Sequence, residues 1–272
     1  MPINESTLPR RVMTLFILAD SSGSMSVDGN MGKVNGAIEE MIPLLQDVSD
    51  ENSDAEIRVA VLEFSSGCKW ATDGVVTLDD FYWQDMTAGG LTDMGAAFTE
   101  LESKLSRKEY MNNASGNYAP VIILLSDGAP TDDYMSGLQL LRHNNWFRCA
   151  MKIAIAVENS ATDVLAEFTG SNETVIRYDS EHSDLKKLLT RLAVVSSTMQ
   201  SRSQSVVHDD PPAPVPGPGP DPDPFGSIWK DWSPENDPTI NQTKQIITQV
   251  TDDEDEEEPG GQNEPIWEAW GC

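Results

Sequence analysis

The chain has 272 residues, a net charge of −27 and an apolar content of 39%. This acidity excludes nucleic acids and anionic membranes as partners, because neutralising phosphates requires Lys and Arg. The sequence contains no run of about 18 apolar residues and no basic leader followed by an apolar segment, so we expect neither a transmembrane helix nor a signal peptide. The three cysteines lie far apart, which favours a reduced, cytoplasmic protein over a disulfide framework.

Apolar strands alternate with amphipathic helices over residues 11–199. Residues 15–19 and 120–126 are almost entirely apolar, as expected for strands buried on both faces of a parallel sheet. Further strands are predicted at residues 56–64, 68–72, 151–157 and 174–178, and helices at residues 33–48, 92–105, 132–145, 161–169 and 184–198. The alternation predicts an α/β fold: a three-layer, doubly wound domain with a mostly parallel central sheet.

The composition divides the chain into four parts. Residues 1–10 are a polar lead-in, and residues 11–199 form the predicted domain. Residues 200–227 are rich first in Ser and then in Pro, Gly and Asp, which indicates an extended linker. Residues 228–272 are acidic, and we expect them to form a disordered tail.

The first strand ends in a cluster of oxygen ligands. Asp20, Ser22 and Ser24 follow its apolar run in the spacing Asp-x-Ser-x-Ser, and hard oxygen donors suit Mg²⁺ or Mn²⁺ better than Zn²⁺. Two more oxygen ligands should reach the same edge of the sheet: Thr92 follows a pair of glycines, and Asp127 ends the strand at 120–126. We therefore predict a metal centre made of Asp20, Ser22, Ser24, Thr92 and Asp127.

Other functions for these residues are disfavoured. The serines could be nucleophiles, but no His is expected beside them and the chain lacks a glycine-rich phosphate loop, so we expect no enzymatic activity. The nearby acids Asp93, Asp132 and Asp133 could be additional metal ligands. Their places at predicted helix N-termini account for them through the helix dipole.

The motifs FILADSSGSM, GGLTDMGAAF and LLSDGAPTDD together resemble the von Willebrand factor A (VWA) domain with its metal-ion-dependent adhesion site (MIDAS). The resemblance covers residues 11–198. It implies that Ser22, Ser24 and Thr92 bind the ion directly or nearly so, and that Asp20 and Asp127 act partly through water. It further implies that a protein partner supplies a carboxylate to the ion.

Within that family, the wording of the motifs is most similar to the bacterial tellurium-resistance, TerY-like branch. This resemblance implies a non-enzymatic adaptor in a stress-response system with a Ser/Thr kinase and a phosphatase as partners. The alternative is a VWA subunit of an ATPase or metal-chelatase-like assembly, in which another chain hydrolyses ATP.

The tail contains two copies of the motif I-W-x-x-W. They comprise Ile228, Trp229, Trp232, Ile266, Trp267 and Trp270. Two Trp side chains at this spacing share one face of a helical turn, which favours docking onto a second protein partner. Packing of the motifs onto their own domain is the alternative, and a tail carboxylate could also occupy the metal centre as an internal ligand.

Overall fold

A computed structural model describes residues 10–53, 55–127, 129–157, 162–178, 184–202 and 238–255. Its centre is one seven-stranded sheet with the order β3-β2-β1-β5-β6-β7, and the short β4 also pairs with β2. The strands are β1 (Arg11–Asp20), β2 (Ala55–Ser65), β3 (Gly67–Trp70), β4 (Val76–Thr77), β5 (Val121–Ser126), β6 (Met151–Val157) and β7 (Val175–Tyr178).

Five of these strands are parallel, and β3 and β4 pair antiparallel with β2. Every residue of β5 and of β6 is buried. This was predicted for β5 from its nearly continuous apolar run, whereas β6 buries Lys152 as well. Side chains alternate between the two faces of the sheet. In β1, Leu15 and Ile17 contribute to one core, whereas Phe16 and Leu18 contribute to the other.

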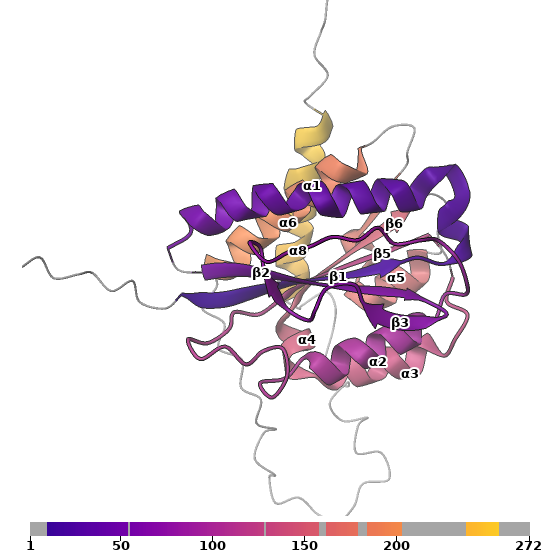
Figure 1. Ribbon diagram of the computed structural model, residues 1–272, viewed down its shortest axis with the longest axis horizontal. Helices are drawn as coiled ribbons and strands as arrows, with labels where there is room; N and C mark the ends of the chain where they lie inside the picture. Colours follow the sequence, from indigo (N-terminus) through magenta and orange to yellow (C-terminus); the bar gives the residue numbers. More distant parts are fainter. Residues whose placement is uncertain are drawn as a thin grey trace, which may run out of the picture.

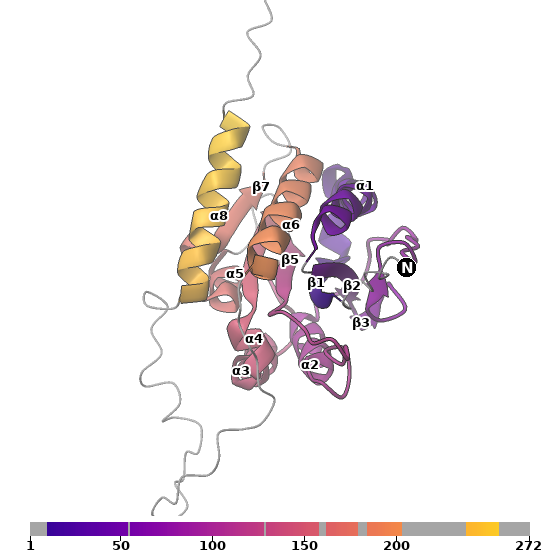
Figure 2. The ribbon, with the colours of Figure 1, turned by 90° about the vertical axis from the view of Figure 1, so that its left-hand side faces the viewer.

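Helices cover both faces of the sheet, so the predicted three-layer, doubly wound α/β architecture is confirmed (Figures 1 and 2). One face carries α1 (Asn30–Glu51), α6 (Leu185–Arg202) and α8 (Pro238–Asp255). The other carries α2 (Met94–Lys104), α3 (Tyr134–His143), α4 (Asn145–Cys149) and α5 (Thr162–Thr169). The short 3₁₀ helices η1 (Gly23–Gly29) and η2 (Asn172–Thr174) lie in connections. None of the described helices is long and apolar enough to cross a membrane.

Helix α8 corrects the predicted organisation of the tail. Residues 238–255 were expected to be disordered, but they form a helix that packs on α6, β6 and η2. Thr243, Ile246 and Val250 on this helix are buried. Their spacing of three and four residues places them on one helical face, and this short apolar stripe was obscured by the acidic composition of the tail. The rest of the predicted tail lies outside the described residues.

Candidate metal centre

The predicted metal ligands lie at the point in the sheet where the strand order reverses. β1 pairs in parallel with β2 on one side and with β5 on the other. The connection from β1 to β2 passes through α1 on one face, and the connection from β2 to β5 passes through α2 on the opposite face. The carboxyl ends of β1 and β5 therefore border a crevice of the kind in which α/β sheets bind ligands. Asp20 ends β1, and Asp127 directly follows β5.

Asp20 is completely buried and held at both carboxylate oxygens. Its Oδ1 accepts a hydrogen bond from the backbone N–H of Ser22 at 2.8 Å, and its Oδ2 accepts one from the hydroxyl of Ser126 at 2.6 Å. Burial raises the pKa of Asp20, although these hydrogen bonds oppose the shift. A buried carboxylate of this kind gains from a nearby cation, which would favour its charged form.

Three further oxygen groups form a connected row beside Asp20. The hydroxyls of Ser22 and Ser24 are 3.0 Å apart, and the Ser24 hydroxyl donates to Asp127 Oδ1 at 2.7 Å. Neighbouring oxygens around an octahedral Mg²⁺ with bonds of about 2.1 Å are separated by about 3.0 Å, so these spacings fit such an ion. Ser22 is buried but Ser24 is exposed, which leaves this side of the row open to solvent.

The loop that carries Thr92 is fixed to the first motif by its backbone. Gly89 N–H donates to the carbonyl of Ser21 at 2.8 Å, and Gly23 N–H donates to the carbonyl of Gly90 at 3.2 Å. Gly90 has φ +83°, and a Cβ there would come within 2.6 Å of Ser66 Oγ. The turn therefore requires glycine.

Thr92 is itself connected to the loop that follows Asp127. Its N–H donates to Thr131 Oγ1 at 3.0 Å, and its carbonyl accepts from Thr131 N–H at 2.9 Å. Thr92 is nearly buried, with 6% of its surface exposed. All three predicted motifs thus meet at one edge of the sheet.

The neighbouring acids accept hydrogen bonds from backbone N–H groups, and only Asp133 does so at the N-terminus of its own helix. Asp132 accepts from the N–H groups of Gly95 and Ala96, both at 2.9 Å, and so caps α2. Asp133 caps α3 and accepts from the N–H of Ser136. Asp93 accepts from the N–H of Gly67 at 2.8 Å.

Two serines beside the centre were missed. Ser126 holds Asp20, and Ser21 donates to Glu63 Oε1 at 2.8 Å. Ser126 could have been found as the polar residue that ends the apolar run of β5. Ser21 gave no such signal, because its partner is set by the register of β1 and β2.

The donor set consists of carboxylates and hydroxyls. Among the described residues, no three His, Cys, Asp or Glu side chains form a group that could hold a metal. The two carboxylates, Asp20 and Asp127, therefore need the hydroxyls of Ser22, Ser24 and Thr92 to complete a binding site. Such an all-oxygen set is suited to Mg²⁺ or Mn²⁺.

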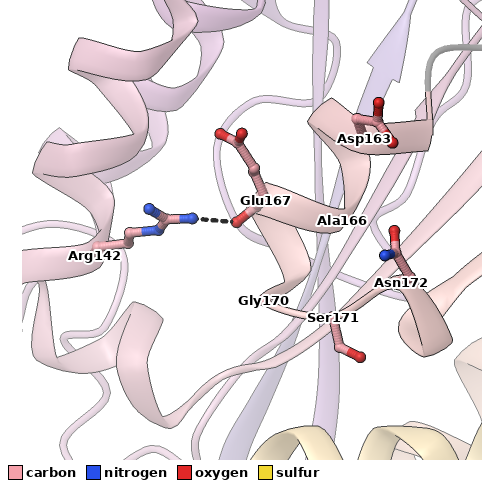
Figure 3. Close-up of a pocket in the computed structure, with 7 residues that line it drawn as sticks. All are labelled: Arg142, Asp163, Ala166, Glu167, Gly170, Ser171 and Asn172. Carbon is pink, nitrogen blue, oxygen red and sulfur yellow. Dashed lines mark hydrogen bonds between the residues drawn. The ribbon is translucent and has the colours of Figure 1, made fainter. Parts of the chain in front are cut away.

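A second depression on the surface lies between α3 and α5 and is unrelated to the metal centre (Figure 3). Arg142 donates to the backbone carbonyl of Glu167 at 2.6 Å, and burial lowers the pKa of this guanidinium. The other polar side chains, Asp163, Ser171 and Asn172, point in different directions (Figure 3). These polar groups do not converge on one point, so the depression is not a candidate ligand site. The two I-W-x-x-W motifs lie outside the described residues.

Comparisons with known proteins agree with this geometry. Residues 14–191 match the family described as von Willebrand factor type A domain. No curated protein matches the chain.

Solved structures share the fold at low sequence identity. Proximal thread matrix protein 1 from the mussel byssus is 19% identical, with a TM-score of 0.51 over 70% of this chain and 48% of that chain. A von Willebrand factor type A protein from Catenulispora acidiphila is 17% identical, with a TM-score of 0.51 over 69% and 43%. The pilus adhesin SpaC from Lactobacillus rhamnosus GG is 14% identical, with a TM-score of 0.52 over 71% and 30%. The matched region thus spans less than half of each of these chains.

Proposed function

Because this chain belongs to the von Willebrand factor type A domain family, we propose that it is a protein-interaction module that binds its partner through a divalent cation. The cation is Mg²⁺ or Mn²⁺, held by Ser22, Ser24 and Thr92, with Asp20 and Asp127 acting partly through water. When bound, the ion supplies an electrophilic position that takes a carboxylate from the partner protein. The observation that carries the proposal is the row of oxygens from Ser22 to Asp127, spaced at 3.0 and 2.7 Å.

The hydrogen bonds of Asp20 support its indirect role. Both of its oxygens already accept protein hydrogen bonds, so its main task is to orient the Ser22 backbone and place negative charge beneath the ion. Ser24 lies on the exposed side, where an incoming carboxylate can approach. Mussel proximal thread matrix protein 1 has a structure with a zinc-occupied MIDAS motif, which supports cation binding at this place in the fold.

Two exposed apolar side chains support a protein as the partner. Val27 lies in η1, just after Ser24, and is 57% exposed; Leu91 lies between Gly90 and Thr92 and is 56% exposed. Both belong to the loops that build the metal centre. A carboxylate flanked by apolar side chains would bury them as it reaches the ion.

We place the module in a bacterial stress-response or tellurium-resistance system, as a non-enzymatic, cytoplasmic adaptor for a Ser/Thr kinase and a phosphatase. Similarity of the three motifs to the TerY-like branch supports this role. The tail motifs, with Trp229, Trp232, Trp267 and Trp270, would bind a second partner. The alternative is the VWA subunit of an ATPase or metal-chelatase-like assembly. A neighbouring gene for an AAA ATPase would favour the alternative, and neighbouring kinase and phosphatase genes the adaptor.

Affinity capture tests the function directly. The wild-type chain, Asp20→Ala and the matched control Ser26→Ala should be used as baits in Mg²⁺ and in EDTA. Ser26 lies in the same loop, but its hydroxyl only donates to the carbonyl of Gly23. We expect a partner captured by wild type and Ser26→Ala in Mg²⁺ and lost with Asp20→Ala or EDTA. A partner set insensitive to both changes would refute the proposal.

A further inference from the structure

Helix α8 is distant in sequence from the rest of the domain but packs against it. Residues 203–237 separate it from α6, yet α8 lies alongside α6 and packs on β6 and η2 (Figure 2). Nothing in the metal centre requires this helix, since none of the oxygen ligands belongs to it. The function of α8 therefore depends on the surface that it covers.

That surface is an apolar strip of the sheet. The β6 side chains on this face are Met151, Ile153, Ile155 and Val157, whereas the opposite face of β6 presents Lys152, Ala154 and Ala156. In β7, Ile176 belongs to the same strip. The large apolar side chains of β6 thus all point toward the layer that contains α8.

The other described helices pack on other parts of the sheet. The connections from β5 to β6 and from β6 to β7 pass through α3, α4 and α5, which all lie on the opposite face. On the α8 face, α1 packs on β2, and α6 reaches β1 and β5. Without α8, the described part of residues 10–202 provides no helix that packs on the strip of β6 as α8 does, and an uncovered apolar patch is typical of a binding surface.

The described contact of α8 rests on few side chains. Among residues 241–251, Thr243, Ile246 and Val250 are buried and Ile247 packs partly buried against the same core, whereas Gln245, Thr248 and Gln249 are exposed. A single described ion pair, Lys244 with Glu173, joins α8 to η2, and both side chains are partly exposed. Exposed pairs of this kind contribute little.

Ordering a free segment also opposes docking of the helix. Its cost in conformational entropy is offset only in part by the few side chains that α8 buries. The balance favours docking that is specific but reversible.

We propose that the surface formed by α6, β6 and η2 is a helix-binding site, and that residues 238–255 are its tethered, exchangeable ligand. The site recognises an amphipathic helix whose apolar residues repeat at the spacing of Thr243, Ile246 and Val250. The linker keeps this ligand at a high effective concentration, so that the site is occupied in the intact chain although the contact itself is weak. The site is independent of the metal centre and of the function proposed for it.

Cutting the linker in the folded protein tests this proposal. A specific protease sequence replaces part of residues 211–222 in the full chain, and the protein is cleaved after folding. We expect the C-terminal fragment to remain bound at high concentration and to separate on dilution, with a dissociation constant in the micromolar range measured by analytical ultracentrifugation. A synthetic peptide of residues 236–257 should displace it.

Two variants of the cleaved chain make the test specific. Ile246→Asp places a charge in the apolar strip and should weaken binding at least about tenfold, whereas the adjacent Gln245→Asp adds the same charge to the exposed face and should change binding less than about twofold. If the freed domain dimerises and the added peptide reverses this, the strip accepts other occupants, which also supports the proposal.

Three results would overturn it. The first is a fragment that stays bound at nanomolar concentrations, which would make α8 an integral part of the domain. The second is a fragment that is free even at several hundred micromolar, which would mean that α8 has no specific site. Equal behaviour of Ile246→Asp and Gln245→Asp would show that the buried face does not determine binding.

Discussion

Replacing Gly90 by alanine should disturb both the stability of the domain and the position of Thr92. Gly90 has φ +83°, a conformation that costs an L-residue about 1–2 kcal/mol. The new Cβ would also lie 2.6 Å from Ser66 Oγ and 3.2 Å from Ser66 N, and overpacking of this kind typically costs about 1–3 kcal/mol. We therefore expect Gly90→Ala to lower the free energy of unfolding by about 2–5 kcal/mol.

Gly89→Ala is the matched control, because a Cβ at Gly89 meets nothing within 4 Å and its φ is not positive. It should change stability by less than about 1 kcal/mol. Both free energies can be measured by urea denaturation in EDTA, which removes any contribution from a bound cation. The double variant Gly90→Ala with Ser66→Ala should recover part of the loss by removing the closest contact, although it also removes the hydrogen bond from Leu91 N–H to Ser66 Oγ. Equal stability of Gly89→Ala and Gly90→Ala would refute this account of the loop.

Two other predictions test the packing of α2 against α3 and the capping of α3. Gly137→Ala should destabilise the domain by about 1–3 kcal/mol in denaturation experiments, because its Cβ would lie 2.5 Å from the carbonyl of Gly95 where α2 meets α3. The control Gly36→Ala lies in α1, where a Cβ meets nothing within 4 Å, and should instead stabilise the domain by about 0.5–1 kcal/mol. A change of stability with the same sign in both variants would contradict the packing of α2 on α3. Hydrogen bonds from Ser136 lower the pKa of Asp133, so its charged form stabilises the folded chain above the unfolded pKa, and this contribution is lost as the pH falls through the lower folded pKa. Asp133→Asn should thus be less stable than wild type at pH 7, with a difference that shrinks on acidification; a difference that is constant between pH 7 and pH 3 would show that the charge does not contribute.

The fold and the positions of the candidate ligands could be predicted because they depend on local patterns. The apolar runs of β1 and β5 end at acidic residues, Asp20 and Asp127, and a parallel sheet places such strand ends at one edge. Thr92 could be added because a glycine pair marked its loop. The hydrogen bonds of Gly89 and Gly90 to residues 21–23 explain why those glycines accompany it.

The parts that could not be predicted depend on contacts between distant segments. Asp132 caps α2 through Gly95 and Ala96, a role that no local pattern around Asp132 reveals. Helix α8 was missed because its apolar stripe is short and the surrounding sequence is acidic. The stripe can be recognised as a packing surface only together with the apolar strip of β6. The sequence predicts β6 as a buried strand but does not indicate which helix covers it.

Cation binding by single-ligand variants tests the central claim most directly. Mn²⁺ can be titrated into the EDTA-treated, dialysed wild-type chain and followed by electron paramagnetic resonance, with Mg²⁺ as competitor. We predict one tight site in wild type and in Ser26→Ala, and at least about tenfold weaker binding in Ser24→Ala and Thr92→Ala, since each loses a direct ligand. Unchanged Mn²⁺ affinity in Ser24→Ala and Thr92→Ala would contradict the assignment of the metal centre.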